Sequence, residues 1–200
     1  MQCIQVLSSL IVLMLQGDES KIIYIYLISR HVISIPESIG NLLFVSSLHV
    51  DDNQLTRLPN SICELTMLTS LTINENQLTS LPDFIGNLSS LSWLSLGHNQ
   101  LTHLPDSIGN LSSLTGLYIT NNQLTHLPDS IGNLTHLKTL NVSNNQLAHL
   151  LDSIGNLSSL DYLNVRDNPI TSTQAGKDEV RWRFWRFWRF WIAKLDIVVD

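Results

Sequence analysis

The sequence predicts a solenoid of the α/β class, in which short parallel strands alternate with short helical or irregular crossover segments. Three observations support this prediction. Asparagine recurs every 23 residues between positions 53 and 168, apolar residues keep the same offsets around each asparagine, and the residues before it alternate between apolar and polar. A unit of this length cannot bury its own leucines, so neighbouring units must stack to form one core.

Each unit begins with a predicted strand. In Leu71-Thr72-Ile73 the side chains alternate in type, which places Leu71 and Ile73 in the core and Thr72 on the outer surface of the sheet. The same offsets recur over residues 22–172, so this segment is predicted to contain about seven strands.

The crossover between two strands corresponds to residues 81–91, LPDFIGNLSSL. Parallel strands need such a connection because a tight hairpin joins only antiparallel neighbours. We expect Ile85 and Leu88 to point into the core, Pro82 to preset φ for a short helical turn, and Gly86 to permit a backbone bend.

The recurring asparagine has a predicted packing role. The chain turns sharply after each strand and leaves backbone groups pointing inward, and a buried amide can satisfy these groups in its own repeat and in the next one. One period before Asn53 the sequence has Arg30, so we expect the first turn to be distorted or the Arg30 side chain to leave the core. The predicted ladder consists of Asn53, Asn76, Asn99, Asn122, Asn145 and Asn168.

Residues 91–114, LSWLSLGHNQLTHLPDSIGNLSSL, resemble a leucine-rich repeat of the 23-residue class. Similar repeats occur in scribble and erbin and in the plant intracellular Ras-group proteins. The resemblance implies a curved horseshoe with a parallel β-sheet on its concave face, acting as a protein-binding platform in signalling or polarity complexes. The sequence departs from the pattern where Leu151 replaces proline, where Cys63 replaces glycine, and after Ile170, where the pattern stops.

Two further regions flank the repeats. Residues 1–21 contain an apolar run and are interpreted as a degenerate first repeat or cap, with a signal or anchor segment as the alternative. Residues 173–200 form an Arg/Trp/Phe-rich tail. The tail has four interpretations: contact with a membrane through residues 181–195, stacking on single-stranded nucleic acid, capping of the solenoid, and an artefact of low-complexity DNA or a wrong gene model.

The charge and the cysteine content indicate the class of partner and the cellular compartment. Residues 1–176 contain 5 Lys and Arg against 13 Asp and Glu, and this acidic balance argues against nucleic acid as a partner of the repeats. The two cysteines, Cys3 and Cys63, do not form a disulfide framework, which favours a cytoplasmic location, with secretion or membrane association as the alternatives. Cys63 is predicted to be a packed thiol.

The residues that face outward from the sheet vary between repeats, whereas the leucines do not. Trp93 faces outward beside the small residues Ser70 and Gly116, and we expect Gly97 and Gly116 to leave open space beside the aromatic rings. We therefore predict that this face binds a partner. The alternatives are a solvated surface without function and a site for carbohydrate or another small polar ligand. The predicted partner-binding residues are Tyr24, Tyr26, His49, Asp51, Thr72, Asn74, Trp93, Ser95, Tyr118, Asn141, Tyr162, Asn164 and Arg166.

Polar residues also repeat on the loop side of the units. A histidine ladder could bind metal or sense pH, although duplication of one repeat would produce it without selection. The aspartates after the prolines are expected to cap short helical turns. The ladders are His103, His126 and His149, and Asp83, Asp106, Asp129 and Asp152; N-glycosylation sequons occur at Asn87, Asn110, Asn133, Asn141 and Asn156.

No catalytic motif stands out in the sequence, and we expect neither an enzyme nor a cofactor or metal site. The predicted function is a non-enzymatic protein–protein interaction module that binds a partner on the concave face in scaffolding or signalling. An extracellular or receptor-type recognition fragment is one alternative. A membrane-associated protein that acts through its Arg/Trp tail is the other.

Overall fold

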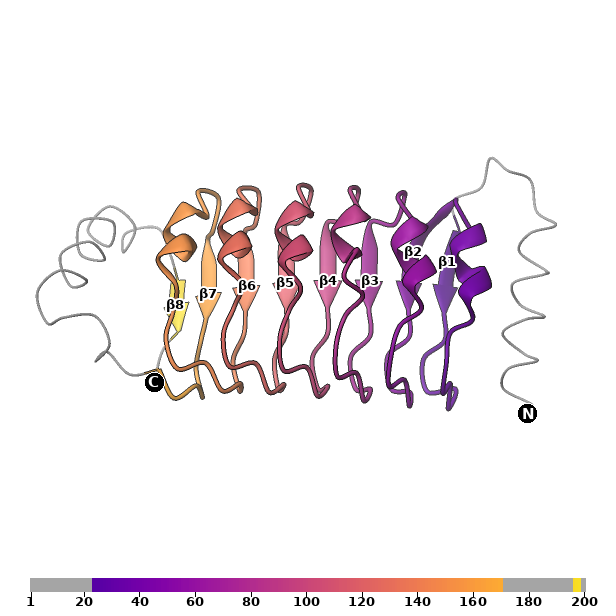
Figure 1. Cartoon of the computed structure of the whole chain (residues 1–200), viewed down its shortest axis with the longest axis horizontal. Helices are drawn as coiled ribbons and strands as arrows, with labels where there is room; N and C mark the ends of the chain where they lie inside the picture. Colours follow the sequence, from indigo (N-terminus) through magenta and orange to yellow (C-terminus); the bar gives the residue numbers. More distant parts are fainter. Residues whose placement is uncertain (1–22, 171–195, 199–200) are drawn as a thin grey trace, which may run out of the picture.

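The computed structural model describes residues 23–170 and the backbone of residues 196–198 (Figure 1). In this part of the chain, parallel strands pair in sequence order to form one open sheet. The strands are β1 (Ile23–Tyr26), β2 (Val45–His49), β3 (Ser70–Thr72), β4 (Trp93–Ser95), β5 (Gly116–Tyr118), β6 (Thr139–Asn141), β7 (Tyr162–Asn164) and β8 (Asp196–Val198).

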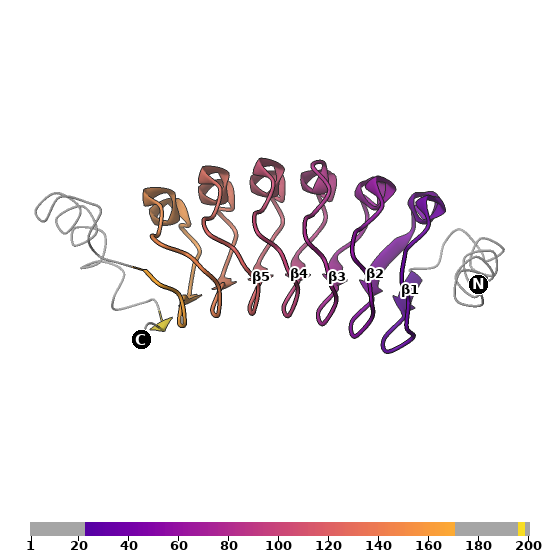
Figure 2. The same cartoon turned by 60° about the horizontal axis from the view of Figure 1, so that its bottom comes forward.

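A short 3₁₀ helix lies between successive strands from β1 to β7. These helices are η1 (Glu37–Asn41), η2 (Asn60–Glu64), η3 (Ile85–Asn87), η4 (Asp106–Asn110), η5 (Asp129–Asn133) and η6 (Asp152–Asn156). Figure 2 shows that the strands follow the inner side of the curve and the helices its outer side. The predicted α/β solenoid, with a concave sheet and short convex helical segments, is therefore confirmed. None of the helices in residues 23–170 has the length and apolar character needed to cross a membrane.

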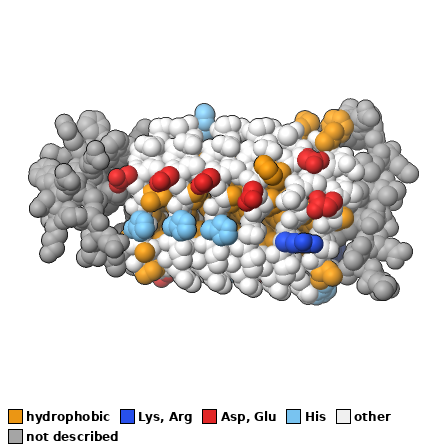
Figure 3. Space-filling view, viewed as in Figure 1, with side chains coloured by type: hydrophobic (Ala, Val, Ile, Leu, Met, Phe, Trp, Pro, Cys, Tyr) orange, Lys and Arg blue, Asp and Glu red, His pale blue; other side chains and the backbone are white. Residues whose placement is uncertain are grey.

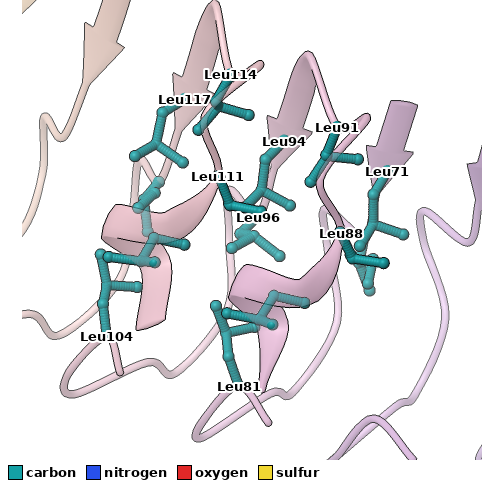
Figure 4. Close-up of a cluster of buried hydrophobic side chains, with 14 of the residues drawn as sticks. Leu71, Leu81, Leu88, Leu91, Leu94, Leu96, Leu104, Leu111, Leu114 and Leu117 are labelled. Carbon is teal, nitrogen blue, oxygen red and sulfur yellow. The ribbon is translucent and has the colours of Figure 1, made fainter. Parts of the chain in front are cut away.

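The predicted core alternation is confirmed. Leu71 and Ile73 are completely buried, and Thr72 between them is half-buried on the concave face. The strand and crossover leucines of one repeat, such as Leu94 and Leu111, form one continuous core with those of the preceding repeat, such as Leu71 and Leu88 (Figure 4). Stacking of the repeats thus removes from water the apolar surface that one repeat would leave exposed.

The asparagine ladder satisfies buried backbone groups, as predicted, but in a different direction along the solenoid. The Oδ1 atom of Asn99 accepts a hydrogen bond from the Leu78 N–H at 2.9 Å, and its Nδ2 donates to the Ile73 carbonyl at 2.8 Å. Both partners lie in the preceding repeat. Nδ2 also donates within its own repeat, to the Leu96 carbonyl at 3.1 Å. The expectation that the asparagine bonds to the next repeat was wrong.

The first repeat is irregular, as the arginine at its ladder position predicts. The Arg30 side chain is exposed, and its backbone N–H donates to Asn53 Oδ1 at 3.1 Å. In every other described repeat only the residue before the asparagine has positive φ, but here both Ser29 (53°) and His31 (54°) do. The pairing of β1 with β2 also contains a register shift between Ile23 and Tyr24.

The glycines of the crossover permit close contact between repeats. A Cβ atom on Gly109 would lie 2.3 Å from the Ser130 carbonyl oxygen of the next repeat. None of the described glycines has positive φ, so the predicted backbone bend is not their role. Cys63 occupies this position in η2, and the following helix η3 is shorter, beginning at Ile85. We attribute the shortening to the additional side chain, because it would press on the same part of the next turn.

One strand lies outside the repeat pattern. β8 pairs with β7 in parallel, with Tyr162 opposite Asp196 and Asn164 opposite Val198. This is the position that a cap would occupy. The predictions for residues 1–21 as a cap or signal and for residues 181–195 as a membrane contact lie outside the described residues.

Candidate functional site

The outward side chains of the sheet form rows across the repeats because the strands pair without offset from β2 onward. Ser70 lies opposite Trp93, which lies opposite Gly116 on β5. A second row runs from Thr72 through Ser95 to Tyr118. Side chains from different repeats therefore form one continuous concave surface, as expected for strands about 4.8 Å apart.

An aromatic pair lies at the centre of this surface. The rings of Trp93 and Tyr118 are 4.5 Å apart between centroids, with an angle of 31° between their planes. Trp93 nevertheless remains 41% exposed, and Tyr118 is half-buried. A large aromatic surface that is fixed by a neighbour and still open to solvent is typical of an interface anchor.

The space above the two concave glycines is already filled. A Cβ atom on Gly116 would lie 2.9 Å from Trp93 Cε3 and 3.1 Å from Tyr118 Cε2. A Cβ atom on Gly97 would lie 2.9 Å from Thr120 Oγ1. The prediction of open space beside the rings was wrong, because the Trp93 ring lies over Gly116. Because Gly116 has no side chain, the Trp93 ring can lie over it. The sequence did not predict this role.

A polar network covers the concave surface between β1 and β4. The Tyr26 ring stacks on His49, with centroids 4.7 Å apart and planes 2° apart. His49 Nδ1 lies 2.8 Å from Thr72 Oγ1, and Thr72 donates to Asp51 Oδ2 at 2.5 Å. Asp51 Oδ1 accepts hydrogen bonds from the backbone N–H and the side-chain Nδ2 of Asn74, at 2.7 and 2.8 Å.

Asn74 extends this network to β4. Its Oδ1 atom accepts hydrogen bonds from Ser95 Oγ and from the Gly97 N–H, each at 2.7 Å. Six of the predicted site residues are thus brought together by direct contact. They are Tyr26, His49, Asp51, Thr72, Asn74 and Ser95.

The remaining predicted residues face the concave side without joining this network. Asn141 Oδ1 accepts hydrogen bonds from the N–H and the Oγ of Ser143, and Asn164 Oδ1 accepts one from the Arg166 N–H. Tyr24 is exposed on β1, and Tyr162 is half-buried on β7. The hydrogen bonds that these two asparagine side chains accept therefore come from within their own repeats.

The convex face carries the repeated polar residues. Figure 3 shows a row of histidines beside a row of acidic residues on this face. His103, His126 and His149 are exposed, and the Nδ1 atoms of His103 and His126 lie within hydrogen-bond distance of the preceding threonine hydroxyl, at 3.1 and 3.0 Å. Among the described residues, no group of three His, Cys, Asp or Glu side chains could hold a metal ion.

The aspartates of this face do not cap the helices, so that expectation was wrong. Asp106, Asp129 and Asp152 are the first residues of η4, η5 and η6, and no side-chain cap hydrogen bond forms there. The residue before each helix has an extended backbone conformation. This residue is a proline before η4 and η5, and Leu151 before η6. The 3₁₀ turn therefore forms at this position without a side-chain acceptor.

The predicted packed thiol is confirmed. Cys63 is buried and free. Burial, with a contribution from the Glu64 carboxylate, raises the pKa of the Cys63 thiol to about 11. A thiol that remains protonated at neutral pH is a poor nucleophile and a poor metal ligand.

The stacked parallel sheet and its asparagine ladder define a leucine-rich repeat solenoid. A family model described as a leucine-rich repeat region matches residues 13–100 and 92–178. The chain therefore belongs to the leucine-rich repeat family. This fold supports a protein–protein interaction module, and the family is generally a non-enzymatic interaction fold. Among curated proteins, none matches the chain.

Solved structures with similar folds come from bacteria and plants. An internalin from Listeria monocytogenes is 27% identical with a TM-score of 0.65, over 84% of this chain and 44% of its own. The ectodomain of the receptor kinase GASSHO1/SCHENGEN3 from Arabidopsis thaliana, in complex with CASPARIAN STRIP INTEGRITY FACTOR 2, is 28% identical with a TM-score of 0.70, over 84% of this chain and 19% of its own.

A plant peptide hormone receptor, RGFR1 in complex with RGF2, is 35% identical with a TM-score of 0.65. The match covers 68% of this chain and 23% of that receptor. The chain thus spans less than half the length of the internalin and about a quarter or less of the two receptors.

Proposed function

We propose that the chain is a non-enzymatic interaction module that binds a polypeptide partner on its concave sheet, around Trp93 and Tyr118. The observation that carries the proposal is the contact between exposed Trp93 and half-buried Tyr118, at the centre of a surface whose residues differ between repeats. Burying a tryptophan removes about 150–250 Å² from water, which makes such a residue an effective anchor for a partner.

The comparisons support a proteinaceous partner. Two of the similar structures are receptors in complex with RGF2 and with CASPARIAN STRIP INTEGRITY FACTOR 2. We further propose a scaffolding or signalling role in the cytoplasm. The buried, unpaired Cys63 supports this location, because a reducing compartment keeps such thiols free.

The experiment is affinity purification with the intact chain, identification of the bound protein, and measurement of its Kd with two variants. Trp93→Ala should weaken binding about thirtyfold or more, because the loss of a tryptophan anchor commonly costs at least about 2 kcal/mol. His126→Ala removes a large exposed side chain from the convex face, so it should leave Kd unchanged. A partner that tolerates Trp93→Ala and Tyr118→Ala but is lost on changes to the convex face would contradict the proposal.

An extracellular recognition module is the second candidate. One of the similar structures is a receptor ectodomain, and four sequon asparagines are exposed at the last positions of convex helices. They are Asn87, Asn110, Asn133 and Asn156. If the chain isolated from its native cells loses mass on treatment with an N-glycosidase, the cytoplasmic location is wrong and this candidate is favoured.

A further inference from the structure

The polar network between β1 and β3 presents hydrogen-bond acceptors to the concave surface. Thr72 has one hydroxyl hydrogen, and it is donated to Asp51 Oδ2. Thr72 Oγ1 can therefore only accept from His49 Nδ1, which must carry the imidazole hydrogen. In the neutral imidazole with its hydrogen on Nδ1, Nε2 of His49 has a lone pair, and no hydrogen bond joins it to the described residues.

The Asp51 carboxylate retains capacity for a further donor. Oδ1 accepts two hydrogen bonds from Asn74, whereas Oδ2 accepts one from Thr72. A carboxylate has about four lone-pair sites, so one remains on Oδ2. Asp51 is half-buried, and its existing bonds hold it in one orientation.

The surroundings are aromatic and negatively charged. The Tyr26 ring stacks on His49 and is 59% exposed. The outward positions of β1 to β6 contain no Lys or Arg, and Asp52 and Glu75 lie three residues after the ends of β2 and β3. Over residues 23–170 the chain has 4 Lys and Arg against 11 Asp and Glu.

We propose that Tyr26, His49 and Asp51 form a subsite for an arginine side chain of the bound polypeptide. A planar guanidinium can donate hydrogen bonds to Asp51 and to His49 Nε2 beside the Tyr26 ring, one face of which His49 covers. This inference rests on the proposed function of the concave face. β1 and β4 are three strands apart, about 14 Å, so an extended segment of about five residues can contact both the subsite and Trp93.

The test uses the intact chain and a phage-displayed library of random peptides about twelve residues long. Peptides are selected on the wild-type chain and counter-selected on Trp93→Ala. The Kd of each selected peptide is then compared with that of its citrulline analogue, in which arginine loses its charge but keeps its length. The wild-type chain should bind the arginine form roughly tenfold more tightly, and high salt should reduce the difference.

Three variants assign the preference to the subsite. Asp51→Asn should reduce the ratio of the two Kd values to about one, and Tyr26→Ala should lower it without disturbing the hydrogen bonds of Asp51. Asp129→Asn changes the net charge by the same amount on the convex face, so the ratio should persist. Urea denaturation checks that each variant is folded.

The outcomes separate the two proposals. If selected peptides lack arginine, or bind equally well with citrulline, or keep their preference in Asp51→Asn, the subsite is overturned while binding that depends on Trp93 stands. If no peptide survives counter-selection on Trp93→Ala, the concave-face function itself is contradicted, and the subsite with it.

Discussion

The concave and convex faces hold neighbouring repeats together in different ways. On the concave face, side chains of different repeats contact one another, as Trp93 does with Tyr118 and Asp51 with Asn74. On the convex face, the backbones approach closely at glycines, as Gly109 does to Ser130, while the His and Asp side chains repeat and face solvent. Side chains that differ between repeats and contact one another are expected on a surface that recognises a partner. Side chains that are the same in successive repeats need no function, because duplication of one repeat produces them.

The largest effect is expected in the core that both faces share. Leu94→Ala removes a completely buried side chain between two repeats and should lower the free energy of unfolding by about 2–5 kcal/mol. Ser95→Ala, one residue further on, removes one half-exposed hydrogen bond to Asn74 and should cost about 0.5–1 kcal/mol. Urea denaturation measures both. Equal losses would contradict the assignment of inward and outward positions.

The backbone contact on the convex face predicts a difference between two glycines. Gly109→Ala places a methyl group against the Ser130 carbonyl and should cost about 1–3 kcal/mol. At Gly155, the same position in η6, nothing lies within 4 Å of an added Cβ. Gly155→Ala should therefore be neutral, or stabilise the fold by about 0.4–1 kcal/mol through a less flexible unfolded chain. If both variants are equally stable, close backbone packing does not join the convex helices.

The aromatic contact on the concave face should appear as coupling between two substitutions. In a double-mutant cycle, Trp93→Ala and Tyr118→Ala should interact by about 0.5–1.5 kcal/mol of unfolding free energy, because each ring packs on the other. Additive effects would mean that the pair does not form in the free protein.

The smallest effect is expected for the copied histidines. His103→Ala and His126→Ala should each change the free energy of unfolding by less than about 0.5 kcal/mol, and their effects should add. Both side chains are exposed, and their described hydrogen bonds are to the adjacent threonine. A coupling as large as that of the aromatic pair would remove the contrast between the two faces.

The repeat period predicted those features that depend on backbone register. It placed the seven strands from β1 to β7, the inward leucines, the outward residues and the buried asparagines. It also identified Arg30 as a defect, because an arginine cannot bond inside a dry core. All these features follow from the position of each residue within the 23-residue repeat.

Features that depend on side-chain conformation or on nearby backbones were not predicted. The tilt of Trp93 over Gly116 depends on its rotamer and on the neighbouring ring, which an offset does not specify. The asparagine partners in the preceding repeat and the uncapped helices depend on the local path of the chain. β8 falls outside the 23-residue register, so the period contains no signal for it.

Hydroxyl-radical footprinting with the purified partner tests most directly whether the concave face is the binding surface. Tryptophan, tyrosine and histidine are all oxidised in this experiment, so one sample reports on both faces at once. Binding should protect Trp93 and Tyr118 and leave His103, His126 and His149 as reactive as in the free chain. Protection of the three histidines with unchanged oxidation of Trp93 and Tyr118 would contradict the account.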